Sequence, residues 1–157
     1  SSAASDVYKR QPIQTDIDFN KGEHRTMTLV FAKERNAESI KEALINRRTA
    51  VFVGDKIIGE EMWLKDLFDN SVKIENIEKN DKSVNITIYN DSDLTFYLKK
   101  TKHAPGITYF RDYEIKPNCR HSIYVKTDNK MESGKIDFEI TNMLIKPGKG
   151  LDYQFSF

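Results

Sequence analysis

Few residues in this 157-residue chain have the types and spacing that chemistry requires. Cys119 and His121 lie two positions apart, which on a strand places both side chains on one face, and a thiol beside an imidazole is a nucleophile pair. No third group that would orient the imidazole is in evidence, so we interpret Cys119 as a packed or idle cysteine. Asp16 and Asp18 form a D-x-D pair that a hard cation can bind, but one such pair is typical of a solvated loop. No catalytic residue is therefore assigned.

A metal site within the chain is not expected either. The three histidines, His24, His103 and His121, are scattered and show neither HxH nor HxxxH spacing. Cys119 is the only cysteine, which excludes an intrachain disulfide and a cysteine-rich zinc site.

The charge balance argues against nucleic acid as a partner. Lysine and arginine number 25 against 24 aspartate and glutamate residues, so the formal charge is +1 and no basic stripe is present. We interpret the clusters 47–48 and 99–102 as solvated surface, and expect Arg47 and Arg48 in the last turn of a helix, where cations offset the carbonyl end. No apolar run approaches the ~20 residues of a membrane-spanning helix.

Residues 1–11, SSAASDVYKRQ, have no apolar periodicity and no signal-peptide core. They resemble a translated library adapter, and an ordinary disordered tail would look similar. The adapter interpretation places the start of the natural sequence near Pro12, with the true N-terminus missing. We exclude the segment from the fold.

Residues 26–53 predict a strand, a helix and a second strand. The strands are expected at 26–32 and 49–53, both short and rich in apolar or β-branched residues. Between them Asn36 suits a helix N-cap, and three apolar residues share one helix face, namely Ile40, Ala43 and Leu44. Such a unit is typical of parallel sheets. Its strands need neighbours on both sides, so part of an α/β domain is expected to be missing.

The remainder predicts a second helix and then a β-sandwich. The helix falls within 59–70, where Trp63 and Phe68 cluster with two leucines. From Val72 onward apolar residues alternate with polar ones, in segments spaced about ~10 residues apart and separated by turn residues, which favours an antiparallel immunoglobulin-like sandwich. The Cys…Trp…Cys signature of true immunoglobulin domains is absent, so only the architecture is predicted.

Four segments carry a family resemblance: 12–16 (PIQTD), 24–35 (HRTMTLVFAKER), 38–44 (ESIKEAL) and 47–51 (RRTAV). Together they resemble the C-terminal end of bacterial PHP (polymerase and histidinol phosphatase) proteins, in particular the PHP-domain phosphodiesterases that carry an immunoglobulin-like C-terminal domain. The resemblance covers residues 12–68, and the sandwich fits the family's architecture without a diagnostic motif.

The resemblance implies an α+β fragment: the terminal βαβ piece of a PHP (β/α) barrel followed by an antiparallel immunoglobulin-like β-sandwich. The expected division is 1–11 for the tail, 12–70 for the end of the barrel and a linker helix, and 71–157 for the sandwich. The parent would be a metal-dependent hydrolase of phosphodiesters or phosphomonoesters, with its own missing barrel as the partner of this fragment.

The implied chemistry uses two or three divalent metals (Zn, Mn or Fe), which polarise phosphoryl oxygens and supply hydroxide near neutral pH. The family's last metal motif, Ser-Asp-x-His, is expected immediately before Pro12 and is absent; Asp6 matches its first half, but Tyr8 stands where the histidine belongs. No metal ligand, catalytic residue or cofactor is therefore assigned to this chain, which is expected to be inactive alone.

His24 and Arg25 match the family's His-Arg pair before the following strand, on a loop near the metal face. The resemblance makes both candidate substrate-binding residues, because the planar guanidinium of Arg25 suits a phosphate. In the alternative, Arg25 pairs with a carboxylate and fixes the loop.

A second hypothesis makes the chain a non-catalytic binding or structural module, whose sandwich docks a partner, a glycan or its own barrel. Alternation places Tyr89 and Tyr97 on the outer side of their strands, where we expect them to be exposed. The sequence assigns neither an oligomeric state nor a compartment, and a periplasmic or extracytoplasmic location of the parent stays open.

Overall fold

A computed structural model describes residues 26–157, which form a mostly β structure with two helices in that range. The elements are β1 (Met27–Val30), α2 (Ala37–Ile45), β2 (Thr49–Val53), β3 (Lys56–Gly59), α3 (Glu61–Ser71), β4 (Val72–Asn80), β5 (Ser83–Asn90), β6 (Phe96–Lys100), β7 (Ile107–Tyr109), β8 (Asp112–Ile115), β9 (Cys119–Thr127), β10 (Lys135–Lys146) and β11 (Lys149–Ser156).

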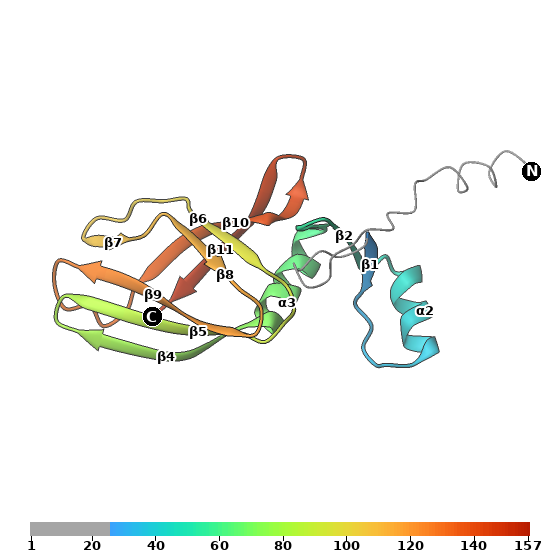
Figure 1. The fold of residues 1–157 in the computed structure, drawn as a ribbon, viewed down its shortest axis with the longest axis horizontal. Helices are drawn as coiled ribbons and strands as arrows, with labels where there is room; N and C mark the ends of the chain where they lie inside the picture. Colours follow the sequence, from blue (N-terminus) through green and yellow to red (C-terminus); the bar gives the residue numbers. More distant parts are fainter. Residues whose placement is uncertain (1–25) are drawn as a thin grey trace, which may run out of the picture.

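The strands from β4 onward build the predicted antiparallel sandwich. One sheet has the order β4-β5-β9-β7, and the other has seven strands in the order β1-β2-β3-β10-β6-β8, with β11 also paired to β10. The sandwich and the N-terminal strands lie at opposite ends of the molecule, with α3 between them (Figure 1). The sandwich prediction is thus confirmed, and its larger sheet continues into the N-terminal segment.

Alternating apolar residues and one helix fill the core. On β5, Val84, Ile86 and Ile88 are fully buried, as their period of two predicts. Helix α3 adds Phe68, whose ring packs edge-on against Phe96, with 5.0 Å between the centroids. The predicted second helix is therefore part of the sandwich core and closes one end of it.

The N-terminal strands do not form the predicted parallel βαβ unit. Strand β1 pairs antiparallel with β2, with Val30 opposite Thr49. The amide of Phe31 then donates to the carbonyl of Arg48 at 2.9 Å, so residues 31–48 close as a hairpin connection that contains α2. Because α2 lies beyond β1 (Figure 1) and does not cross back over the sheet, the chain cannot return in the parallel direction.

The ends of α2 are partly as predicted. The side chain of Asn36 accepts a hydrogen bond from the Ser39 amide at 2.7 Å, which confirms the N-cap. The helix ends at Ile45, and Arg47 has a left-handed φ of 55°, so Arg47 and Arg48 lie outside the last turn. Their predicted position was wrong, because the chain turns back there to start β2.

A short strand missed in the sequence joins the two parts of the larger sheet. Strand β3 follows β2 through a turn at Gly54 and pairs in parallel with Met143 and Leu144 of β10. The neighbouring Asn142 is buried; its amide group donates to the carbonyls of Asp55 at 2.9 Å and Thr95 at 2.7 Å, and its carbonyl accepts from the Tyr97 amide at 3.1 Å. One side chain therefore connects the β2–β3 turn to the sandwich.

We expect Asn142→Ala to lower the free energy of unfolding by about 2–4 kcal/mol, because it leaves buried backbone groups without partners. Urea unfolding followed by tryptophan fluorescence measures this, since Trp63 lies on α3. The control is Asn85→Ala on the outer side of β5, expected within ~0.5 kcal/mol of the parent. Equal effects of the two substitutions would contradict the role assigned to Asn142.

Candidate functional site

The two candidate substrate-binding residues, His24 and Arg25, lie outside the described residues, as do Asp16 and Asp18. In the part of the chain that the structure describes, no group of three or more His, Cys, Asp or Glu side chains is placed to hold a metal ion. No helix among residues 26–157 is long and apolar enough to cross a membrane.

The cysteine–histidine pair is not assembled for catalysis. Cys119 is exposed at the start of β9, and the Nε2 atom of His121 accepts a hydrogen bond from the Lys116 amide at 2.9 Å. Arg120 points to Glu75 and makes two hydrogen bonds with its carboxylate, at 2.6 and 3.0 Å. Each group near the thiol is thus committed to another partner.

The two tyrosines expected on the outer side are half-buried. The guanidinium of Arg120 lies 5.1 Å from the centroid of the Tyr89 ring and covers part of it. Tyr97 lines a groove of about 510 Å³ together with Asp112, Glu114 and Thr141. Burial, and then the charges of Glu114 and Asp55, raise the pKa of Tyr97. The expectation that both tyrosines would be exposed was therefore wrong.

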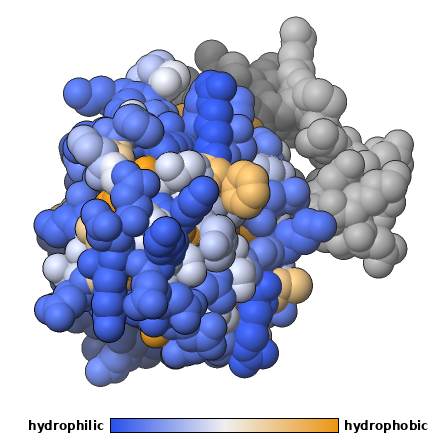
Figure 2. Space-filling model, turned by 90° about the vertical axis from the view of Figure 1, so that its left-hand side faces the viewer, coloured by the Kyte–Doolittle hydropathy of each residue, from blue (hydrophilic) through white to orange (hydrophobic). Residues whose placement is uncertain are grey.

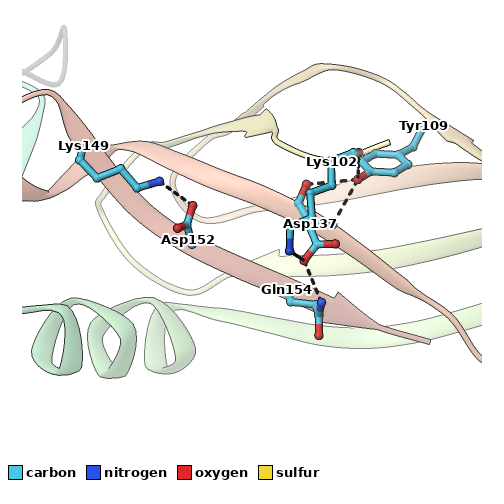
Figure 3. Close-up of polar contacts among 6 residues, drawn as sticks. All are labelled: Lys102, Tyr109, Asp137, Lys149, Asp152 and Gln154. Atoms are coloured by element: carbon cyan, nitrogen blue, oxygen red, sulfur yellow. Dashed lines mark hydrogen bonds and ion pairs between the residues drawn. The ribbon is translucent and has the colours of Figure 1, made fainter. Parts of the chain in front are cut away.

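A polar groove of about 470 Å³ runs along β10 and β11. Asp137 accepts from the Gln154 side chain at 2.8 Å and faces Lys102 at 3.8 Å, while Lys149 bonds Asp152 at 2.7 Å (Figure 3). The hydrogen bond to Asp152 raises the pKa of Lys149. These charged side chains pair with one another and thereby stabilise the β10–β11 hairpin. The groove therefore presents no unpaired charge to a ligand.

One further polar contact links α3 to this hairpin. The Tyr153 hydroxyl donates to Asp69 Oδ1 at 2.6 Å. Burial, and then the hydrogen bond and charge of Asp69, raise the pKa of Tyr153 well above its usual value of 10.0. Burial is the largest single effect on Asp69 and opposes ionisation, but the hydrogen bonds from Lys65 and Tyr153, together with the charges of Lys65 and Lys73, outweigh it and lower the pKa of Asp69.

A third groove lies in the N-terminal segment. It has a volume of about 460 Å³ between β1 and the start of α2, and its lining includes Thr28, Val30 and Ile40. Of the predicted apolar face of α2, Ala43 is fully buried, whereas Ile40 and Leu44 are exposed. The helix therefore has an apolar stripe without a covering partner among the described residues.

Comparisons with known proteins bear on both parts of the chain. Residues 71–156 match the model of a family described as an Ig-like domain. The chain is also similar to the crystal structure of a two-domain protein from Bacteroides vulgatus ATCC 8482 containing a predicted PHP-like metal-dependent phosphoesterase, with 47% sequence identity and a TM-score of 0.84. This confirms the resemblance to PHP proteins with an immunoglobulin-like domain. A comparison with curated proteins found no match.

The alignment covers 94% of this chain and 43% of the Bacteroides chain. The chain thus spans less than half of the length of this relative.

We expect the stability to fall at alkaline pH because of Tyr153. Its folded-state pKa is raised. The contribution of Tyr153 to the free energy of unfolding is therefore fully present below the pKa of the unfolded state, and it is lost as pH rises through the higher pKa of the folded state. Urea unfolding at pH 8 to 11 measures how the free energy of unfolding depends on pH. Above pH 10, Tyr153→Phe should remove the equivalent of about one proton from that dependence. The control Tyr124→Phe, at an exposed position, should leave the slope unchanged, and an unchanged slope in Tyr153→Phe would contradict the assignment.

Proposed function

Since the chain belongs to the Ig-like domain family through residues 71–156, and its similarity to the Bacteroides protein extends beyond them, we propose that it is the C-terminal part of a PHP-like metal-dependent phosphoesterase. The observation that carries this proposal is the 47% identity over 94% of the chain. An Ig-like domain alone is shared by proteins of many functions. The similarity before residue 71 is therefore the informative part.

The proposed division assigns residues 12–70 to the C-terminal end of the phosphoesterase unit and a linker helix, α3, which packs into the sandwich core, and residues 71–157 to the Ig-like sandwich. A change in packing supports it. Before α3 the strands are short and leave apolar side chains exposed, whereas β4 starts immediately after α3, and the sandwich encloses its own apolar residues. In this proposal the antiparallel β1–β2 pair takes the place of the parallel strands expected at the end of the barrel.

The hydrolytic chemistry belongs to the upstream part of the parent. Divalent metals, Zn, Mn or Fe, would activate water and polarise the phosphate ester there. The described residues do not offer a ligand set that fits such metals, so no step of hydrolysis is routed through them. We assign to this chain a supporting role: Arg25, with His24 beside it, would hold the substrate phosphate, and the sandwich would act as a structural module.

The 157-residue chain should not hydrolyse p-nitrophenyl phosphodiesters or phosphomonoesters, with or without added manganese or zinc. A two-domain protein, in which this chain follows the rest of the Bacteroides relative in place of the matched part, should hydrolyse at least one of them in a metal-dependent way. Absorbance of released nitrophenolate measures both. Metal-dependent turnover by the purified chain alone would overturn the assignment of the metal site to the upstream part.

In that two-domain protein, Arg25→Lys should lower kcat/KM about tenfold to a hundredfold, because a lysine cannot make the bidentate contact with phosphate. Arg111→Lys, at an exposed position on the sandwich, is the control and should leave kcat/KM unchanged. If Arg25 instead pairs with a carboxylate to fix its loop, Arg25→Lys should keep kcat/KM close to that of the control.

A further inference from the structure

Exposed apolar side chains are concentrated in the N-terminal quarter of the described chain. Of the 11 large hydrophobic residues that are exposed within residues 26–157, eight lie before residue 63: Met27, Ile40, Leu44, Ile45, Val51, Val53, Ile58 and Met62. By contrast, the end of the sandwich away from these strands is mostly hydrophilic (Figure 2). Clustered exposed apolar surface of this kind marks an interaction site.

Three of these residues form a continuous surface, which we call the aliphatic face: Val51 and Val53 of β2 and Ile58 of β3. Val51 lies directly opposite Ile58 in the antiparallel ladder, and Val53 follows on the same side of β2. The row continues to Thr28 of β1 on one side and to Leu144 of β10 on the other. The face thus spans four neighbouring strands.

At the β1 edge of the sheet, residues 26–157 supply no further strand. Strand β1 is the last strand in the sheet order, and among the described residues it pairs with β2 alone. Proteins usually protect such an edge with charged residues, proline or a bulge. The sequence of β1, Met-Thr-Leu-Val, contains no charged residue and no proline. An open edge beside an aliphatic face is suited to receive another strand.

A partly buried cation in the same hairpin lacks part of its hydrogen bonding. Arg48 pairs through its terminal nitrogen with Glu42, but its buried Nε atom has no partner among the described residues. Unsatisfied buried donors are uncommon in complete proteins.

We propose that the catalytic domain upstream of this chain packs on the aliphatic face and on the exposed stripe of α2, and adds a strand to the free edge of β1. This rests on the proposed function. The upstream chain enters at β1 itself, so the domain that it carries is tethered next to the open edge. Tethering gives an effective concentration in the millimolar range for short linkers, which a second copy of the chain does not have. More than half of the Bacteroides relative lies outside the matched region. A parent protein of similar length would carry an upstream domain large enough to cover this surface.

The test compares the 157-residue chain with the two-domain protein described above, using hydrogen exchange detected by mass spectrometry. The catalytic domain should slow exchange in the peptides covering β1 and α2 by about tenfold or more. Ile58→Glu should abolish this protection. Ile74→Glu is the matched control, because Ile74 is also an isoleucine on a strand and both residues are 44% exposed. The control should keep the protection.

The same two variants in the 157-residue chain check for simple misfolding, and there they should have equal unfolding midpoints. Val51→Glu serves as a second variant if Ile58→Glu does not fold. Equal exchange with and without the catalytic domain, or equal effects of Ile58→Glu and Ile74→Glu in the two-domain protein, would overturn the proposal. The proposal would also be overturned if the 157-residue chain sediments as a dimer, Ile58→Glu dissociates that dimer, and the two-domain protein shows no added protection. A second copy of the chain would then be the occupant.

Hydrolysis by the same two-domain protein separates the two proposals. Intact protection without metal-dependent hydrolysis would refute the phosphoesterase function and leave the docking surface in place. Metal-dependent hydrolysis without protection would refute only the docking surface.

Discussion

The short parallel contact between β3 and β10 is the constraint on which the rest of the structure depends. It involves Ile57 and Ile58 on one side and Met143 and Leu144 on the other. Parallel pairs require long connections, and here the connection contains most of the sandwich. The hydrogen bonds of Asn142 fix the same junction from inside, because they bind the β2–β3 turn and the start of β6 to one side chain. Without this junction the hairpin of β1 and β2 would have no sheet to extend.

Helix α3 supports the junction from one side. Its residue Phe68 is fully buried and packs on Phe96 of the sandwich. On the other side, Trp63 stacks on Phe31, just after β1, with 6.0 Å between ring centroids. The Asp69–Tyr153 hydrogen bond ties the last turn of α3 to β11. The helix that was expected to be a linker therefore packs against both the sandwich and the N-terminal segment.

The sequence predicted those features that depend on neighbours along the chain. The period of two in β5 and the cap at Asn36 are local signals, and both were right. The direction of β1 against β2 depends on where α2 packs, and β3 is stabilised by residues 143–144, more than 80 positions away. No local pattern carries this information. Strand β3 also has only four residues, Lys-Ile-Ile-Gly, which show no alternation.

The candidate sites illustrate the same limit. His24 and Arg25 are predicted through family resemblance alone, whereas the spacing of Ile40, Ala43 and Leu44 correctly predicted an apolar helix face. Periodicity shows that such a face needs a partner, but not whether the partner lies in the same chain. Only the structure revealed that Ala43 is covered and that Ile40 and Leu44 are exposed.

The position of Phe68 has a consequence for how such modules are exchanged between proteins. The Ig-like family match begins at residue 71, yet the ring that closes the end of the sandwich core is supplied three residues earlier. Cutting at the family boundary would remove a fully buried aromatic residue and open a cavity beside Phe96, Tyr153 and Phe155. The physical unit that can be transferred by recombination is therefore α3 together with the sandwich, one helix longer than the unit that sequence similarity defines.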